Sequence, residues 1–291
     1  MKKRGKSINL YLLDGEVTGR IKCTLANWTG IVYKIPRTEL EESRDRVELK
    51  QSGVYFLFGM ADDMEKDVVY IGQAQTRKNG KGVLGRLHEH HNDKDYWTEV
   101  VILTTSNNSF GPTEISYLEN RFYSLATEAN RLIIKNNNEP TLGNITEEKE
   151  SELEDFIDYS KIVLGSLGYR LFEPVIREDN ELESGEPELI YKTQKTFAKG
   201  MRTNEGFVVR KGSKISKDTQ PSCPESAVRR RVEEIKNITD ESILKVDILL
   251  SSPSTAAAFV SGYSASGNDV WKDHSGKSLG EIEKSKSEFI L

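Results

Sequence analysis

The chain has very few of the residues that form disulfide frameworks and structural zinc sites. Its 291 residues include two cysteines and four histidines. Cys23 and Cys223 lie far apart, and neither belongs to a closely spaced pair of the kind that binds zinc. We therefore expect two reduced thiols, as is usual for a cytoplasmic protein.

Long apolar segments are also absent. No run approaches the roughly 20 apolar residues that a membrane-spanning helix needs. The stretch after Lys2-Lys3-Arg4 is too short and too broken by polar residues for the core of an export signal. We expect a cytoplasmic protein with no membrane partner. A chain of this length is expected to form two or three domains.

The charged residues are unevenly distributed, although the net charge is only −5. Residues 139–190 contain 15 acidic and 4 basic side chains, whereas residues 190–236 contain 12 basic and 5 acidic ones. Such asymmetry is common in chains that bind a polyanion. Two solvated surfaces of opposite sign that keep the protein soluble would give the same pattern, so charge alone leaves both interpretations open.

Composition divides the chain into four parts. Alternating apolar residues predict short strands in the first part, and the charged stretch 38–50 predicts a helix. A stretch rich in Glu, Asn, Gly and Pro predicts a linker. The predicted parts are a β-rich N-terminal extension (1–48), an α/β domain (49–175), a linker (176–190) and a second small α+β domain (191–291).

The α/β domain is predicted from the order of its elements. Apolar and β-branched runs predict strands, and apolar residues at helical spacing predict helices. The predicted strands are 54–58, 68–71 and 100–103, and the predicted helices are 84–91, a longer one that begins at Pro112 and is stopped by residues 136–140, and 146–167. The order strand, strand, helix, strand, helix is typical of a small α/β layer fold.

Polar side chains in this domain have the chemistry that phosphodiester hydrolysis needs. That reaction needs an activated nucleophile, positive charge on the phosphate and commonly a metal held by carboxylate. Tyrosine and histidine can move protons, and arginine can hold a phosphate through two hydrogen bonds. A carboxylate at the edge of an apolar helix stripe, such as Glu119, is costly unless it meets a cation such as Mg²⁺. The candidate residues are Tyr55, Tyr70, Arg86, His90 and Glu119.

Each of these residues also has a plain alternative interpretation. The tyrosines could be ordinary strand aromatics, and Arg86 and His90 could form a solvated helix face. Ser116 and Glu119 match the spacing of a capping box, although Pro112 indicates that the helix starts earlier. Three histidines within four positions, at 88, 90 and 91, suggest zinc, but the other ligands of a structural site are absent nearby.

Taken together, the order and spacing of these residues resemble the GIY-YIG nuclease family over roughly residues 50–140. The first motif is present as Gly53-Val54-Tyr55 and the second as Tyr70-Ile71-Gly72. Arg86 and His90 match within Gly-Arg-Leu-His-Glu-His, and Glu119 matches within Tyr-Leu-Glu-Asn. Two features depart from the family: the loop between the motifs is longer, and the family's late asparagine could be Asn136 or Asn138, since both follow the long helix.

The resemblance implies a three-stranded antiparallel sheet flanked by helices and an endonuclease that cleaves DNA with one Mg²⁺ or Mn²⁺ ion. It implies that Tyr55 relays a proton from the attacking water, that Arg86 holds the scissile phosphate and that Glu119 holds the metal. Tyr70 and His90 would orient the water and the phosphate. Residues that would contact the substrate are Gly72 and either Asn136 or Asn138.

The C-terminal part resembles a second family, the uncharacterised DUF4357 domain, over about residues 205–283. The motifs are Val-Val-Arg-Lys-Gly-Ser, Ser-Pro-Ser-Thr-Ala-Ala-Ala-Phe and Trp-Lys-Asp. The family implies no chemistry. Because this part holds the basic segment, we predict that it binds the DNA backbone through residues such as Lys211 and Arg230, with Phe207 and Trp271 nearby in sequence. The alternative is a stabilising domain whose surface lysines contribute little to binding.

The rival to a nuclease is a catalytically silent nucleic-acid-binding module on the same fold. It is disfavoured because all the side chains of the catalytic set are present. The sequence does not fix the oligomeric state and leaves a homodimer open.

Overall fold

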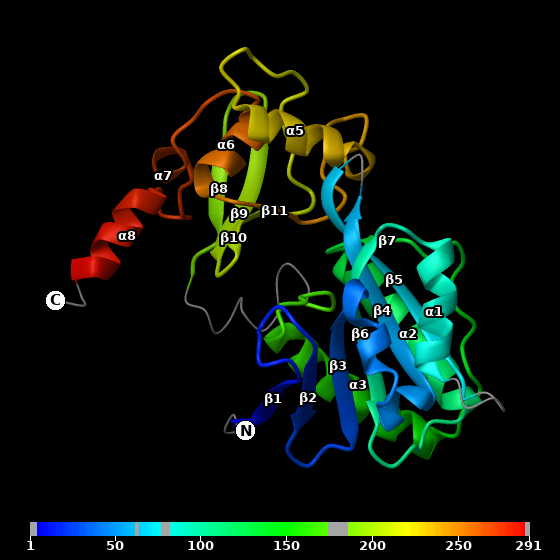
Figure 1. The fold of residues 1–291 in the computed structure, drawn as a ribbon. Helices are drawn as coiled ribbons and strands as arrows, with labels where there is room; N and C mark the ends of the chain where they lie inside the picture. Colours follow the sequence, from blue (N-terminus) through cyan, green and yellow to red (C-terminus); the bar gives the residue numbers. More distant parts are fainter. Residues whose placement is uncertain (1–4, 62–63, 77–81, 174–185, 289–291) are drawn as a thin grey trace. The chain divides into compact units, whose positions relative to one another are not determined.

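The protein is described from a computed structural model that covers residues 5–61, 64–76, 82–173 and 186–288 (Figure 1). The chain divides into two units, 1–174 and 175–291. Residues 176–185 of the predicted linker lie outside the described residues. No helix among the residues with described structure has the length and apolar character to cross a bilayer.

The first unit is built on a seven-stranded sheet with the order β1-β2-β3-β6-β4-β5-β7. Neighbouring strands are antiparallel except for β5 and β7, which run parallel. The strands are β1 (Ile8–Leu12), β2 (Ile21–Leu25), β3 (Gly30–Pro36), β4 (Gly53–Ala61), β5 (Met64–Ala74), β6 (Trp97–Thr105) and β7 (Ile133–Ile134).

The prediction of a three-stranded sheet is wrong, because the strands before residue 48 join the same sheet. Tyr33 on β3 lies opposite Ile102 on β6, and the whole of β3 pairs along β6. The strands predicted at 54–58, 68–71 and 100–103 are confirmed as parts of β4, β5 and β6. The predicted boundary at residue 48 therefore falls inside one continuous sheet.

Both faces of this sheet are covered. Helices α2 (Pro112–Ala129) and α3 (Glu147–Ser166) pack on one face with Phe56 and Val101, and α1 (Val83–Asp93) packs on the other with Tyr55 and Ile102 (Figure 1). Because alternate residues point to opposite faces, burial on both sides explains why β4 is a continuous apolar run rather than an alternating one.

The helix limits follow from local chemistry. Gly111 is the N-cap of α2, Pro112 occupies its first turn and Asn130 ends it in the left-handed conformation at φ 49°. The helix thus begins before Ser116, which rules out the capping-box interpretation of Glu119. Thr146 caps α3 by accepting a hydrogen bond from the backbone N–H of Lys149.

The stretch 38–50, predicted as one helix, instead forms short 3₁₀ turns. These are η1 (Arg37–Glu39), η2 (Glu41–Ser43) and η3 (Val47–Lys50). Leu40 and Leu49 are both buried. At nine residues apart they would lie about 180° apart on an α-helix, so a single helix could not bury both.

The second unit has a four-stranded antiparallel sheet with the order β11-β10-β9-β8. Its core contains Phe207, Phe259 and Trp271. The strands are β8 (Leu189–Lys192), β9 (Phe197–Thr203), β10 (Gly206–Val209) and β11 (Ile248–Leu250), and the helices are α5 (Glu225–Glu233), η4 (Ile235–Asn237), α6 (Pro253–Ser261), α7 (Gly267–Val270) and α8 (Leu279–Glu288). The prediction of a second mixed unit is confirmed at this level.

Candidate active site

The two predicted tyrosines lie on neighbouring strands and point to the face of the sheet that α1 covers. Tyr55 on β4 lies opposite Gly72 on β5, and Tyr70 lies two residues before Gly72. The centroids of the two tyrosine rings are 6.3 Å apart. Tyr55 is almost fully buried, whereas Tyr70 is only partly so. The hairpin therefore brings both hydroxyl-bearing rings to one place.

Gly72 is required by the packing of Tyr55. A Cβ atom at position 72 would lie 2.5 Å from both the hydroxyl oxygen and the ring carbon Cζ of Tyr55. This separation is far below normal van der Waals contact. The glycine of the second motif thus lets the Tyr55 ring cross over β5, and this packing role is visible without any substrate.

His90 contacts Tyr55 directly. Its Nε2 atom lies 2.7 Å from the Tyr55 hydroxyl, and the His90 side chain is buried among the two tyrosine rings. Burial, together with the charges of Arg86 and Lys94, lowers the pKa of His90 to about 4. The imidazole is therefore neutral at pH 7. Its Nδ1 atom is buried and has no hydrogen-bond partner among the described residues.

The tyrosine hydroxyls are protonated at neutral pH. Burial and the neighbouring Tyr70 raise the pKa of Tyr55 far above its usual range, although Arg86 acts in the opposite direction. Burial and the charge of Glu119 also raise the pKa of Tyr70. Each hydroxyl is therefore not ionised at neutral pH. It can act as a proton relay, which accepts one proton while it donates another.

Arg86 carries the positive charge of the site. Its Nη1 atom donates to Glu89 Oε2 at 2.7 Å, and a hydrogen bond to Tyr55 contributes to its raised pKa. The Arg86 side chain is 40% exposed. One end of the guanidinium is thus anchored, and an incoming anion can reach the group from solvent.

Glu119 lies on α2, partly buried, at the edge of the apolar stripe as predicted. Burial raises its pKa, while hydrogen bonds from the side chain and backbone of Gln73 and the charge of Arg86 act to lower it. Gln73 is held in turn, because its Nε2 atom donates to Ser116 Oγ at 3.0 Å. The carboxylate is therefore fixed beside the exposed edge of β5, within electrostatic reach of Arg86 and both tyrosines.

The donor set at this place fits a magnesium ion better than zinc. Mg²⁺ is commonly held by one or two carboxylates, with water and phosphate oxygens completing its shell, and Glu119 is one such carboxylate. Within the described ranges there is no group of three or more Asp, Glu, His or Cys side chains that could hold a metal by themselves. A zinc site would need such a group.

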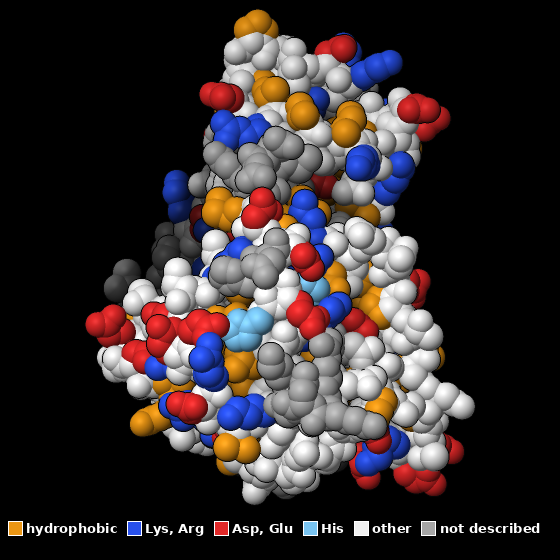
Figure 2. Space-filling view, turned by 45° about the vertical axis from the view of Figure 1, so that its right-hand side comes forward, with side chains coloured by type: hydrophobic (Ala, Val, Ile, Leu, Met, Phe, Trp, Pro, Cys, Tyr) orange, Lys and Arg blue, Asp and Glu red, His pale blue; other side chains and the backbone are white. Residues whose placement is uncertain are grey.

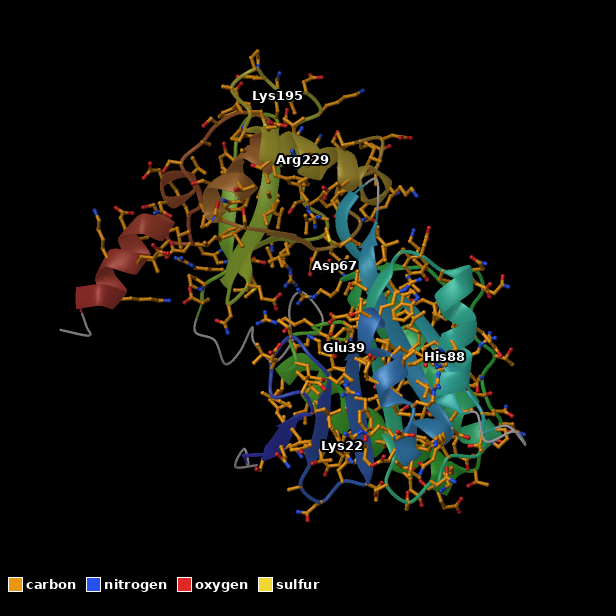
Figure 3. All side chains as sticks on the ribbon, viewed as in Figure 1. Lys22, Glu39, Asp67, His88, Lys195 and Arg229 are labelled. Atoms are coloured by element: carbon orange, nitrogen blue, oxygen red, sulfur yellow. The ribbon has the colours of Figure 1, made fainter. Side chains whose placement is uncertain are left out.

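The histidines predicted as alternative zinc ligands have separate partners. His88 Nδ1 lies 3.2 Å from Glu41 Oε1, whereas His90 contacts Tyr55. Figure 3 shows where His88 extends from α1. The side chain of His91 lies outside the described residues. His88 and His90 thus do not share a ligand position.

The two candidate asparagines differ. The Asn136 side chain accepts from the backbone N–H of Ile71 at 3.0 Å and donates to the Ile71 carbonyl at 2.8 Å. It thereby pairs with the open edge of β5 in the middle of the second motif. Asn138 is exposed. Asn136 is therefore placed to position Tyr70 and Gly72 through the backbone.

Two contributors to this site were missed by sequence reasoning. Gln73 holds Glu119, and the Lys94 ammonium lies 4.3 Å from the centroid of the Tyr70 ring. Gln73 could have been found from the sequence, because it is a polar residue on the same strand face as the apolar residues Val69 and Ile71, the face that packs toward α2. No pattern in the sequence indicated Lys94, since its contact depends on the end of α1.

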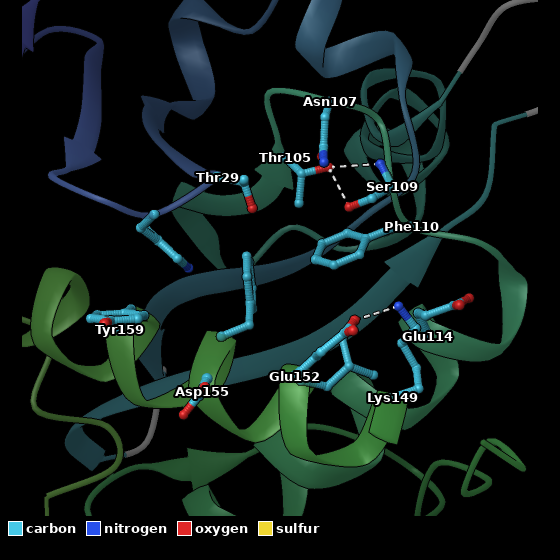
Figure 4. A pocket seen from close by; sticks show the side chains of 13 residues that line it. Thr29, Thr105, Asn107, Ser109, Phe110, Glu114, Lys149, Glu152, Asp155 and Tyr159 are labelled. Atoms are coloured by element: carbon cyan, nitrogen blue, oxygen red, sulfur yellow. Dashed lines mark hydrogen bonds and ion pairs between the residues drawn. The ribbon is translucent and has the colours of Figure 1, made fainter. Parts of the chain in front are cut away.

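A pocket that is open to solvent lies elsewhere in the first unit (Figure 4). None of the five candidate residues lines it. The chemistry described above therefore lies outside this pocket, as expected if the substrate is a polymer bound on the surface.

The residues of the second unit that were named with the predicted DNA contact differ in their surroundings. Phe207 and Trp271, which lie near the basic residues in sequence, are fully buried in the core, so neither ring is accessible to DNA. Arg230 pairs with Glu233 at 2.9 Å and with Glu234 at 3.1 Å, which compensates its charge. Lys211 is exposed, and its backbone N–H donates to Asp247 Oδ1 at 2.7 Å.

Lysine and arginine do not form one broad patch on the face of the molecule that Figure 2 draws. On the face drawn in Figure 2 they are interspersed with Asp and Glu. Figure 3 marks Lys195 and Arg229 as two of the basic residues of the second unit.

Comparison with known proteins identifies the second unit. Residues 189–283 match the family model described as "Domain of unknown function (DUF4357)". Residues 189–283 form a DUF4357 domain. The match confirms the predicted resemblance and begins earlier in the chain than predicted, at β8. No curated protein and no solved structure matches the chain. The family match thus lies within the second unit.

Proposed function

We propose that the first unit is a GIY-YIG-type endonuclease that hydrolyses DNA phosphodiester bonds with one Mg²⁺ or Mn²⁺ ion. The observation that carries the proposal is the 2.7 Å contact between the Tyr55 hydroxyl and His90 Nε2 beside Arg86. An ordinary pair of strand aromatics does not require a neutral imidazole buried against a hydroxyl, or an arginine beside that hydroxyl.

Tyr55 acts as the proton relay in this proposal. A water molecule attacks the phosphorus, the Tyr55 oxygen takes its proton and the Tyr55 hydroxyl proton passes to His90 Nε2. The bond between phosphorus and the leaving oxygen breaks, and the leaving oxygen takes a proton from solvent. The proton count balances because His90, neutral beforehand, returns its proton to water afterwards.

Arg86 binds the phosphate and prepares His90. Its positive charge lowers the pKa of His90 in the free protein. A phosphate bound to Arg86 places negative charge beside it, which raises the pKa of His90 and makes the imidazole a better proton acceptor. Substrate binding thus makes His90 a better proton acceptor.

Glu119 would hold the metal ion, which when bound supplies positive charge for the phosphate and the leaving oxygen. The residues fit such an ion because the carboxylate is fixed by Gln73 and remains close to Arg86. Tyr70 orients the phosphate, and Asn136 fixes the strand that carries Tyr70. Lys211 of the DUF4357 domain adds a contact to the DNA backbone.

Cleavage of supercoiled plasmid DNA with Mg²⁺ tests the proposal. Glu119→Gln and Tyr55→Phe should each lower the initial rate by at least about 100-fold, as expected for removal of a metal ligand or a proton relay. Glu128→Gln, on the exposed side of the same helix, and Tyr11→Phe, on β1, are matched controls that should keep the native rate.

Equal cleavage by all five proteins would overturn the residue assignments. Binding of DNA by a native protein that shows no cleavage with Mg²⁺ or Mn²⁺ would favour the rival, a catalytically silent module.

A further inference from the structure

The DUF4357 domain carries an exposed row of side chains across its sheet that takes no part in the site described above. Lys192 on β8 lies opposite Phe197 on β9, and Phe197 lies opposite Lys214. Lys214 lies opposite Ile243 in the next segment. Residues directly opposite each other in antiparallel strands point to the same face. We call these four residues the Phe197 row.

Phe197 is an exposed aromatic ring on a well-held backbone. Its side chain is 42% exposed, whereas Phe207 and Trp271 of the same domain are fully buried. The Phe197 N–H donates to the Lys214 carbonyl at 3.0 Å, and the Lys214 N–H donates to the Phe197 carbonyl at 2.7 Å. Such a ring gains nothing from water but can stack on the flat face of a nucleobase.

The lysines on either side of the ring are available to bind anions. Lys192 and Lys214 are exposed, and no ion pair engages either of them within the part of the chain that the structure describes. Lys199, on the same face, is by contrast paired with Glu188 at 2.9 Å. Lys195 lies exposed in the turn just before Phe197 and adds a further charge (Figure 3).

The row has a defined end. Exposed Asp240 and Glu241 lie just before Ile243 in the chain, so the positive part of the row stops there. The two lysines that flank Phe197 are separated by two strand spacings, about 10 Å. A ring with a cation on each side is therefore a compact unit, large enough for one base and the phosphates next to it.

We infer that the Phe197 row binds single-stranded DNA, with one base stacked on Phe197 and the neighbouring phosphates bound by Lys192 and Lys214. In a duplex the base faces are covered by their neighbours, so the ring has no partner there. The binding uses no metal ion and no residue of the first unit, and it stands whether or not the first unit cleaves DNA.

Fluorescence anisotropy of a labelled 12-residue oligothymidylate, measured with the full-length protein in EDTA, tests the inference. The native protein should bind it more tightly than a duplex of equal length. Phe197→Ala should weaken binding about tenfold, and Phe197→Trp should retain it, because stacking needs the flat ring. The slope of log affinity against log salt should be unchanged in Phe197→Ala.

Replacement of the lysines should change the salt dependence of binding. Each lost phosphate contact reduces the salt slope for a single strand by about 0.7, so Lys192→Gln with Lys214→Gln should reduce it by about 1.4. The matched control is Ile235→Ala with Lys236→Gln, an exposed apolar residue and an exposed lysine on η4, which should leave affinity and slope as in the native protein.

Three outcomes would overturn the inference: absence of binding by the native protein, equal affinity for native and Phe197→Ala, or an equal loss in the η4 control. Circular dichroism checks that each variant is folded. If Phe197→Ala is not folded, Phe197→Leu replaces it, since leucine keeps apolar bulk without a flat face. Loss of plasmid cleavage with intact binding would count against the nuclease alone.

Discussion

The hydroxyl of Tyr55 and the imidazole of His90 lie 2.7 Å apart, side by side within the first unit. Burial and two nearby cations keep the imidazole neutral, and burial keeps the proton on the hydroxyl. Neither group can accept a charge cheaply while the site is empty of anions. The pair is thus stable at neutral pH and sensitive to acid, which gives a measurable property independent of catalysis.

Native stability should fall in mild acid because of His90. The unfolded chain takes up a proton at this residue as the pH drops below about 6.5, whereas the native protein does so only near pH 4, the lowered pKa. Protonation between these values therefore favours unfolding, and the contribution of His90 is complete above pH 6.5 and lost toward pH 4. We expect a loss of up to about 3 kcal/mol over this interval.

Urea unfolding at several pH values between 7 and 4 measures this loss. His90→Gln should flatten the dependence on pH, whatever its effect on stability at pH 7. His88→Gln, on the same helix but paired with Glu41, should retain the native dependence. A dependence of equal steepness in native protein and His90→Gln would show that other groups cause it.

Replacement of Gly72 should disturb the protein without touching any charged group. In Gly72→Ala the new Cβ atom meets the Tyr55 ring and hydroxyl oxygen at 2.5 Å, so the ring must move. We expect a loss of about 1–3 kcal/mol in unfolding free energy, together with loss of plasmid cleavage because Tyr55 leaves His90. Gly5→Ala, with open space around it, should be neutral in both assays. A native-like Gly72→Ala would mean that Tyr55 has room to shift.

Most elements of the first unit could be predicted because their patterns are local. The helix from Pro112 and the strand that contains Tyr55 have strong periodicity or strong apolar character, and both are confirmed. The width of the sheet could not be predicted, because the pairing of Tyr33 with Ile102 joins residues far apart in the chain. Nothing in the sequence of either segment indicates which strand it pairs with.

The residue types of the candidate site could be predicted from the sequence, but the contacts that hold those residues in place could not. The spacing of Arg86 and His90 on one helix was visible in the sequence, but the role of Gly72 depends on a ring that crosses over it. In the DUF4357 domain, nearness in sequence to basic residues was misleading. Phe207 points into the core and Phe197 points out, and only the register of β9 and β10 decides between them.

The two asparagines that the sequence left open can be separated by mutation. Asn136→Ala removes a donor and an acceptor from the edge of β5, which leaves the N–H and carbonyl of Ile71 unpaired. We expect a loss of about 1–3 kcal/mol in unfolding free energy and slower plasmid cleavage. Asn138→Ala changes an exposed residue and should behave as the native protein. The opposite ranking in the cleavage assay would assign the substrate contact to Asn138.

Neighbouring arginines of the DUF4357 domain should differ sharply in their effect on stability. Arg231 is buried and donates to three carbonyl oxygens, those of Phe259, Ser216 and Val260. Arg231→Met keeps much of the apolar bulk but removes every donor from these carbonyls, two of which belong to α6. Thermal unfolding should show a loss of about 2–4 kcal/mol. Arg229→Gln changes a half-exposed residue whose partner Glu225 lies one helical turn away, a type of pair that contributes below about 0.5 kcal/mol. Equal effects of the two substitutions would show that the three carbonyls find other donors when Arg231 is replaced.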